Sequence, residues 1–352
     1  MQSLVFKAGS GALAAVRKGG FSAARIGTIA GASGGAKWLV LSQLDRAILE
    51  TIVPKLEGPV HLIGSSIGSW RFSCYAQNEP VAAIERFEMA YLEQSYSADP
   101  DIEEISAKSR EILDFVLRDN GVEQVLSHRV LRPSVMAVRA KHLVSSEHRV
   151  ALGTGLLAAA TLNVLSRRSL GLFFERALFF DERDRPPFFD LDDFPTQQVP
   201  LTRENYRDAV IASGSIPMIL KGVRDISGAM PGTYRDGGVI DYHLDLPVSE
   251  PDRLTLFPHF YSHIVPGWFD KKLAWRRPDP GNIDRTILVS PSAEFVASLP
   301  LSKIPDRTDF VNFSSLERTR NWRAAVSACE SMAEEFVDVI ENDRLAARLE
   351  PL

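Results

Sequence analysis

The stretch His61-Leu62-Ile63-Gly64-Ser65-Ser66-Ile67-Gly68 joins a short apolar run to a turn of the pattern G-x-S-x-G. The run from Val60 to Ile63 predicts a buried strand, and a helix is expected from Ile67. On such a strand-to-helix turn the central serine has strained backbone and an outward-facing hydroxyl, and glycine fits the crowded positions on either side, here Gly64 and Gly68. The stretch therefore predicts a nucleophilic serine, Ser66, at the carboxyl end of a strand.

The same pattern occurs earlier, as Gly31-Ala32-Ser33-Gly34-Gly35, between a predicted strand at 25–30 and a helix expected from about Ala36. It does not open a G-x-G-x-x-G dinucleotide loop, and Lys37 is followed by Trp38, unlike a Walker phosphate loop. Consecutive glycine amides can approach an oxyanion closely. We therefore expect Gly34, Gly35 and Ala36 to be oxyanion donors and Ser66 the nucleophile. A purely structural turn remains the alternative for each motif.

Strands and helices alternate along the rest of the chain. Further strands are predicted at 134–139, 174–180, 254–257 and 286–290, and helices at 9–18, 82–95, 102–117, 152–165, 204–212 and 316–340, with a long loop at 181–200. Such alternation favours a three-layer α/β/α fold with a mainly parallel central sheet. We expect a single domain over 1–352, with the motifs in a core of about 24–247 and a less typical C-terminal layer at about 248–352.

The bulk composition is that of a globular enzyme. The 352 residues are 45% hydrophobic and 24% charged, and a net charge of −5 argues against nucleic-acid binding. The two cysteines, Cys74 and Cys329, lack zinc-site spacing, so we expect no metal and no cofactor. No apolar run is long enough to span a bilayer, and the first 18 residues make a poor secretory signal. A cytoplasmic protein with, at most, peripheral membrane contact is expected.

A further motif is Tyr234-Arg235-Asp236-Gly237-Gly238, which alone is a common turn signal. It follows the small-residue run Ala212-Ser213-Gly214-Ser215-Ile216-Pro217. Together with the Gly34-Gly35-Ala36-Lys37 loop and the Ser66 turn, in this order, these pieces resemble the patatin-like phospholipase family. They span well over half of the chain. After Asp236 the run Val239–Leu244 lacks the Asn and Pro that the family often has, which suggests a divergent branch.

The resemblance implies a Ser–Asp dyad without a catalytic histidine, acting on acyl esters of phospholipids or other glycerolipids. Ser66 is then the nucleophile and Asp236 its partner, Gly34, Gly35 and Ala36 line the oxyanion loop, and Lys37 matches the basic position after it. Burial would raise the pKa of Asp236 to make it a useful base, whereas Lys37 or Arg235 nearby would oppose that shift.

Two alternatives stay open. The first is an α/β-hydrolase with a Ser–Asp–His triad, whose histidine would be His243, His259 or His263; His61 is expected to be packed. The second is a catalytically inactive patatin-like binding protein.

Two other stretches carry weaker signals. The aromatic and basic stretch at 257–277 suits either docking to anionic lipid or a pocket lid. The acidic stretch at 190–193 is expected to be a solvated loop rather than a calcium site.

Overall fold

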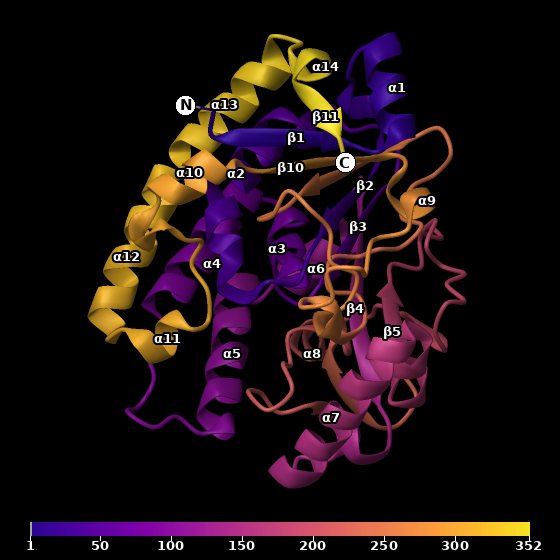
Figure 1. Ribbon diagram of the computed structural model, residues 1–352, viewed down its shortest axis with the longest axis vertical. Helices are drawn as coiled ribbons and strands as arrows, with labels where there is room; N and C mark the ends of the chain where they lie inside the picture. The colour runs from indigo at the N-terminus through magenta and orange to yellow at the C-terminus, as the bar shows by residue number, and fades with distance from the viewer. Residues whose placement is uncertain (1) are drawn as a thin grey trace.

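An eleven-stranded sheet forms the centre of the computed structural model, which describes residues 2–352 (Figure 1). Its main path has the order β11-β1-β10-β9-β2-β3-β4-β5-β6, and β8 joins β4 to β7 beside this path. The strands are β1 (Leu4–Ala8), β2 (Ile26–Gly31), β3 (Val60–Ser65), β4 (Leu131–Ala140), β5 (Phe174–Phe180), β6 (Thr196–Pro200), β7 (Val223–Arg224), β8 (Thr233–Asp236), β9 (Leu254–Pro258), β10 (Thr286–Pro291) and β11 (Leu349–Pro351).

The middle of the sheet is parallel. Strands β10, β9, β2, β3 and β4 run side by side in one direction, whereas β1 is antiparallel to β10, and β5 and β8 are antiparallel to β4. Parallel strands covered on both faces are apolar along their whole length, and every residue of β2 and β3 is buried. Full burial of a side chain such as Ile29 or Leu62 stabilises the fold by about 1.5–3 kcal/mol.

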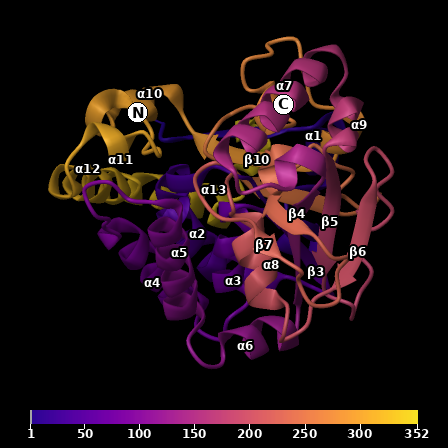
Figure 2. The same ribbon diagram turned by 90° about the horizontal axis from the view of Figure 1, so that it is seen from below.

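Helices cover both faces of this sheet (Figure 2). They are α1 (Ser10–Gly19), α2 (Ser42–Thr51), α3 (Ile67–Tyr75), α4 (Pro80–Glu93), α5 (Ile102–Leu117), α6 (Gly121–Ser127), α7 (Arg149–Leu165), α8 (Tyr206–Ser213), α9 (Pro280–Ile283), α10 (Ala293–Ser298), α11 (Asp309–Asn312), α12 (Ser315–Ala328), α13 (Glu330–Glu341) and α14 (Leu345–Arg348). The view of Figure 2 places α3 and α8 on one side of β3 and β4 and α7 on the other. The predicted three-layer α/β/α class with a mainly parallel sheet is confirmed.

Several elements differ from the predictions. The helix expected from Ala36 begins as a 3-10 helix, η2 (Gly35–Leu41), before α2, and the long C-terminal helix is divided at Cys329 into α12 and α13. The loop predicted at 181–200 was wrong at its end, where β6 forms an edge strand with alternating buried and exposed residues. Strands β1 and β8 were not predicted. Strand β8 has the polar sequence Thr-Tyr-Arg-Asp, and pairing buries all four residues.

The C-terminal region contributes to the centre of the sheet, because β9 pairs directly with β2 and β10 with β9. Within residues 2–352, every helix falls short of the length and apolarity that crossing a bilayer requires.

Candidate active site

Ser66 occupies a strained position between β3 and α3. Its φ of 54° and ψ of −125° lie in a region that a residue with a side chain rarely adopts, at a cost of about 1–3 kcal/mol. The turn is also tightly packed. A Cβ on Gly68 would lie 1.9 Å from the carbonyl oxygen of Gly31, and one on Gly64 would lie 2.5 Å from the amide nitrogen of Ser69. Glycine is therefore required on both sides of Ser66.

The Ser66 hydroxyl donates a hydrogen bond of 2.7 Å to Oδ2 of Asp236, and both side chains are buried. Asp236 is the last residue of β8, and its Oδ1 accepts the Gly238 N–H at 2.7 Å. The Asp236 N–H in turn donates to the carbonyl of Ser215. Two segments far apart in the sequence thus bring together the two residues predicted to form the dyad.

Burial raises the pKa of Asp236 to about 6 from its ordinary value of 3.8. The hydrogen bonds from Ser66 and Gly238 and the positive charges of Lys271 and Arg307 oppose this shift without cancelling it. A carboxylate with a pKa near 6 is ionised at neutral pH and is a better proton acceptor than an ordinary aspartate.

Arg235 does not act on Asp236 as its position in the sequence suggested. Neighbouring residues of a strand point to opposite faces, and the Arg235 guanidinium donates to the carbonyls of Val144 and Ser146 and pairs with Glu147. Arg235 therefore holds the segment before α7 against the far face of β8.

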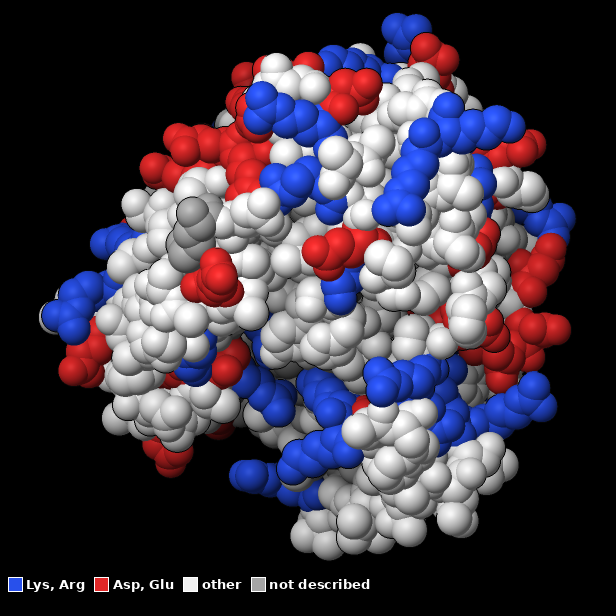
Figure 3. Space-filling model, turned by 45° about the horizontal axis from the view of Figure 1, so that its top comes forward, with Lys and Arg blue, Asp and Glu red and all other residues white. Residues whose placement is uncertain are grey.

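Lys271 and Arg307 were not predicted as site residues, and no motif marks either. The Lys271 ammonium lies 4.0 Å from the centre of the Tyr242 ring. Loss of hydration, together with the positive charges of Lys37 and Arg307, lowers the pKa of Lys271 to about 7, although the charge of Asp236 opposes this shift. Loss of hydration also lowers the pKa of Lys37, whose Nζ lies 5.8 Å from the centre of the Phe260 ring. These three cations thus gather beside the dyad, and Figure 3 shows a hollow bordered by Lys and Arg side chains.

The loop predicted to hold the oxyanion donors lies next to the Ser66 turn. Gly31 and Gly64 are directly paired at the ends of β2 and β3, so the loops that follow them leave the same edge of the sheet. Gly35 has a φ of 56°, and Gly34 is so close to Phe260 that a Cβ would lie 2.4 Å from its ring. Within residues 2–352, the amides of Gly34, Gly35 and Ala36 donate no hydrogen bond. These N–H groups begin η2, where the helix dipole also favours negative charge.

Ser33 has structural partners only. Its hydroxyl donates to Oγ of Ser65 at 2.9 Å, and its N–H donates to the carbonyl of Tyr242. Gly238 approaches it so closely that a Cβ there would lie 2.4 Å from the Ser33 hydroxyl oxygen. Ser33 therefore joins the glycine-rich loop at 31–35 to the loop that follows Asp236.

The run from Ala212 to Pro217 joins both halves of the site. The Ser66 N–H donates to Oγ of Ser213 at 2.8 Å, and that hydroxyl donates to the carbonyl of Met136 on β4. Two residues later, the Ser215 carbonyl accepts the Asp236 N–H. In the sequence Ser213 is only one member of a small-residue run, and its hydrogen bond to Ser66 gives that run a physical role.

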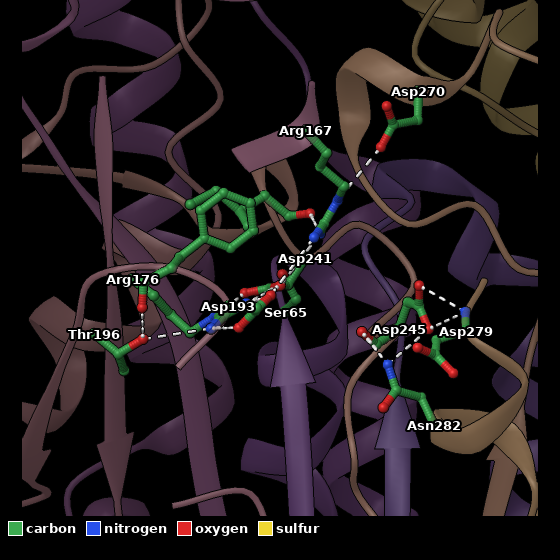
Figure 4. Close-up of polar contacts among 12 residues, drawn as sticks. Ser65, Arg167, Arg176, Asp193, Thr196, Asp241, Asp245, Asp270, Asp279 and Asn282 are labelled. Atoms are coloured by element: carbon green, nitrogen blue, oxygen red, sulfur yellow. Dashed lines mark hydrogen bonds and ion pairs between the residues drawn. The ribbon is translucent and has the colours of Figure 1, made fainter. Parts of the chain in front are cut away.

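The segment after Asp236 is anchored by a buried ion pair (Figure 4). Arg176 on β5 donates two hydrogen bonds to Asp241, of 2.7 and 2.9 Å, and two more to Asp193. Asp241 belongs to the run that departs from the family pattern. Asp193 belongs to the acidic stretch predicted to be solvated, and it is exposed as predicted while its carboxylate also pairs with Arg176.

The histidines offer no third member of a triad. His243 and His259 are buried with ring centres 4.3 Å apart, and Nδ1 of each accepts a backbone N–H. Burial lowers the pKa of both, which keeps them neutral. His263 is exposed and stacks on Tyr261. In the described residues, no histidine hydrogen-bonds to Ser66 or Asp236. His61 packs edge-on against Phe188, as expected.

Metal ligands are not gathered anywhere in residues 2–352, since no group of three or more His, Cys, Asp or Glu side chains there could hold an ion. Cys74 and Cys329 are buried free thiols.

No family model matches the chain, and no curated protein matches it. Among solved structures, the chain is similar to VipD from Legionella pneumophila, with 12% sequence identity and a TM-score of 0.33. The match covers 69% of this chain and 51% of that one, so it extends over about half the length of VipD. At this level of similarity, the function has to be inferred from the geometry of the chain itself.

Proposed function

We propose that the protein is a serine hydrolase that cleaves acyl esters of phospholipids or other glycerolipids through a Ser66–Asp236 dyad. The hydrogen bond of 2.7 Å between Ser66 Oγ and Asp236 Oδ2 carries this proposal, because it joins a strained serine to a buried carboxylate. Structural turns seldom keep a serine at positive φ, whereas a nucleophile held at the tip of a strand-to-helix turn benefits from that geometry.

The proposed reaction has two halves. Ser66 Oγ attacks the ester carbonyl carbon while its proton passes to Asp236, and the resulting oxyanion accepts N–H groups of the loop from Gly34 to Ala36. When the tetrahedral intermediate collapses, the alcohol leaves with the proton from Asp236 and the acyl group stays on Ser66. Asp236 then takes a proton from water, whose oxygen attacks the acyl carbon. Collapse of the second intermediate releases the fatty acid and returns the proton to Ser66.

The charges at the site favour phosphate-bearing lipids over neutral ones. Lys37, Lys271 and Arg307 form no ion pair within residues 2–352, although neighbouring acidic groups such as Asp306 influence Lys37. An anionic head group beside the scissile ester would be stabilised by these cations.

The alternatives have less support. A Ser–Asp–His triad requires a histidine in contact with the dyad, and the side chains of His243 and His259 contact each other instead. An inactive binding protein would have no need for backbone strain at Ser66 or for free amides in the glycine loop.

Labelling with a fluorophosphonate tests the assignment in wild type, Ser66→Ala and Ser33→Ala. We expect labelling of wild type and Ser33→Ala and none of Ser66→Ala. Labelling that depends on Ser33 would reverse the assignment, and no labelling of any form would favour the inactive binding protein. Release of fatty acid from phosphatidylglycerol and from triacylglycerol by unlabelled samples of the same three proteins then tests the lipid class.

A further inference from the structure

Helix α7 has an unusually apolar exposed side. No charged residue occurs between Val150 and Ser166, and Leu157 and Leu165 are 69% and 81% exposed. The other exposed apolar side chains of this surface are Leu143, Val150, Leu162, Val164 and Leu172. A large exposed apolar patch on a soluble protein marks a surface that contacts another protein or a membrane.

A second segment extends this surface. Trp275 is 64% exposed, and its neighbour Arg276 donates a hydrogen bond of 2.7 Å to the carbonyl of Asn163, near the end of α7. The Asn163 side chain in turn donates to Asp270 at 2.8 Å. The exposed tryptophan and the apolar helix are therefore held together, and tryptophan is a side chain that favours the interface between lipid and water.

The border of this surface is strongly basic. The stretches 149–174 and 271–278 contain Arg149, Arg167, Arg168, Lys271, Lys272, Arg276 and Arg277 but no Asp or Glu. Two of these arginines are held by buried carboxylates, Arg167 and Arg276. Within residues 2–352, the other five form no ion pair. In Figure 3 an uncharged lobe at the bottom, where α7 lies in Figure 1, is bordered by Lys and Arg side chains.

The inner side of α7 contacts the segment that carries the general base. Leu152 and Ala159 belong to the same buried cluster as Val239 and Ile240, which follow Asp236 by three and four residues. Lys271 links the basic border to the dyad, because its charge acts on Asp236. A surface in contact with α7 would therefore lie beside the site.

We propose that α7 and Trp275 dock the protein on an anionic lipid bilayer, with the apolar side chains entering the interface and the basic border contacting the head groups. Charge complementarity decides for this occupant, because the two stretches that border the apolar surface contain seven basic residues and no acidic one, and Arg149, Arg168, Lys272 and Arg277 form no ion pair within residues 2–352. The inference rests on the proposed function, to which it adds that the substrate is taken from an anionic membrane. This surface is centred on α7, whereas the sequence pointed to the stretch at 257–277.

Vesicle co-sedimentation tests the proposal. Wild type should bind vesicles of phosphatidylglycerol and phosphatidylcholine, and Leu157→Asp with Leu165→Asp should reduce the partition coefficient by at least about tenfold, because charges at these positions resist burial in lipid. The matched control, Val311→Asp with Leu316→Asp, changes two side chains that are 87% and 82% exposed on α11 and α12, and should bind within twofold of wild type.

A second variant separates the basic border from the apolar surface. Arg168→Gln, Lys272→Gln and Arg277→Gln together should weaken binding to phosphatidylglycerol vesicles by about fivefold for each charge removed. Binding to pure phosphatidylcholine should change little. Equal losses on both vesicles would overturn the electrostatic part of the proposal.

Hydrolysis of p-nitrophenyl butyrate, a water-soluble ester, separates docking from catalysis, and we expect it to be unchanged in all these variants. Wild-type esterase activity without vesicle binding would overturn the docking proposal alone. Vesicle binding without esterase activity would overturn the proposed function alone. If Leu157→Asp with Leu165→Asp instead dissociates a dimer in analytical ultracentrifugation, a second copy covers α7 and the lipid proposal fails.

Discussion

The turns at Gly31–Gly35 and Gly64–Gly68 share one five-residue pattern but differ in where the backbone is strained. In the first turn the residue at positive φ is a glycine, Gly35, which adopts this conformation at little cost. In the second it is Ser66, which does so only against a steric penalty.

Ser66 and Ser33 also differ in the group that accepts their hydroxyl hydrogen bond. Ser66 faces the carboxylate of Asp236, whereas Ser33 faces the hydroxyl of Ser65. A neutral hydroxyl is a poor acceptor for a proton that has to leave during attack, and a carboxylate is a good one. The five-residue pattern therefore identifies a turn, whereas the strained residue and its hydrogen-bond partner determine whether the serine in that turn can react.

The largest expected effect separates the two serines by activity. Ser66→Ala should lower kcat for a soluble ester by about 10⁴-fold or more, because it removes the nucleophile. Ser33→Ala should stay within about tenfold of wild type, because it removes only a packing hydroxyl that supports a neighbouring loop. Steady-state hydrolysis of p-nitrophenyl butyrate measures both. Comparable losses in the two variants would contradict the distinction drawn between the turns.

The next effect concerns the glycines. Gly68→Ala should lower the free energy of unfolding by about 3 kcal/mol, because its Cβ would overlap the Gly31 carbonyl oxygen. Gly35→Ala should cost only about 1 kcal/mol, because its φ is unfavourable but the space is open, with the nearest atom 4.0 Å away. Urea denaturation followed by circular dichroism compares them. A larger loss for Gly35→Ala would mean that the first turn is the more constrained one.

A third expectation sharpens the role of the carboxylate. Because the pKa of Asp236 is raised to about 6 and its ionised form accepts the proton, kcat/KM should fall as the pH decreases through about 6. Lys271→Met removes a cation that lowers this pKa, so the acid limb should move to higher pH by a few tenths of a unit. The pH profile with a soluble ester measures both. A shift to lower pH would show that Lys271 does not act on Asp236.

The smallest effect tests the strain itself. Ser66→Gly should raise the free energy of unfolding by up to about 1 kcal/mol, because glycine relieves the positive φ. Ser33→Gly should lower it slightly, because Ser33 is not at positive φ and loses its bond to Ser65. Thermal denaturation at several pH values is the readout. Equal changes at the two positions would place no strain at Ser66.

Much of the sheet could be predicted from the sequence, because the parallel strands at its centre are short segments of mainly apolar residues. The pair Ser66 and Asp236 could be proposed from short motifs, and the structure places them 2.7 Å apart. The expectation that Arg235 could influence Asp236 failed because strand β8 was not foreseen, and only in a strand do adjacent side chains point apart.

Other parts of the site carry no local signal. Arg307 follows β10 and belongs to no motif. Lys271 lies in the aromatic and basic stretch at 257–277, but nothing in that stretch indicates that its charge acts on Asp236. Asp193 seemed an ordinary acidic residue until its partner Arg176 was known. Such contacts depend on the order of the strands in space, which periodicity along the chain does not encode.

Strand β1 pairs with β10 through Leu4 and Pro291, and also with β11, so one side of the sheet joins segments that are nearly a whole chain length apart. During synthesis on a ribosome, β1 emerges early and has to remain unpaired until β10 is made, whereas β2, β3 and β4 can associate much sooner. The half of the sheet that holds Ser66 can thus assemble while β1 still lacks a partner. Until β10 is made, the unpaired edge of β1 is open to pairing with other chains or to binding by a chaperone.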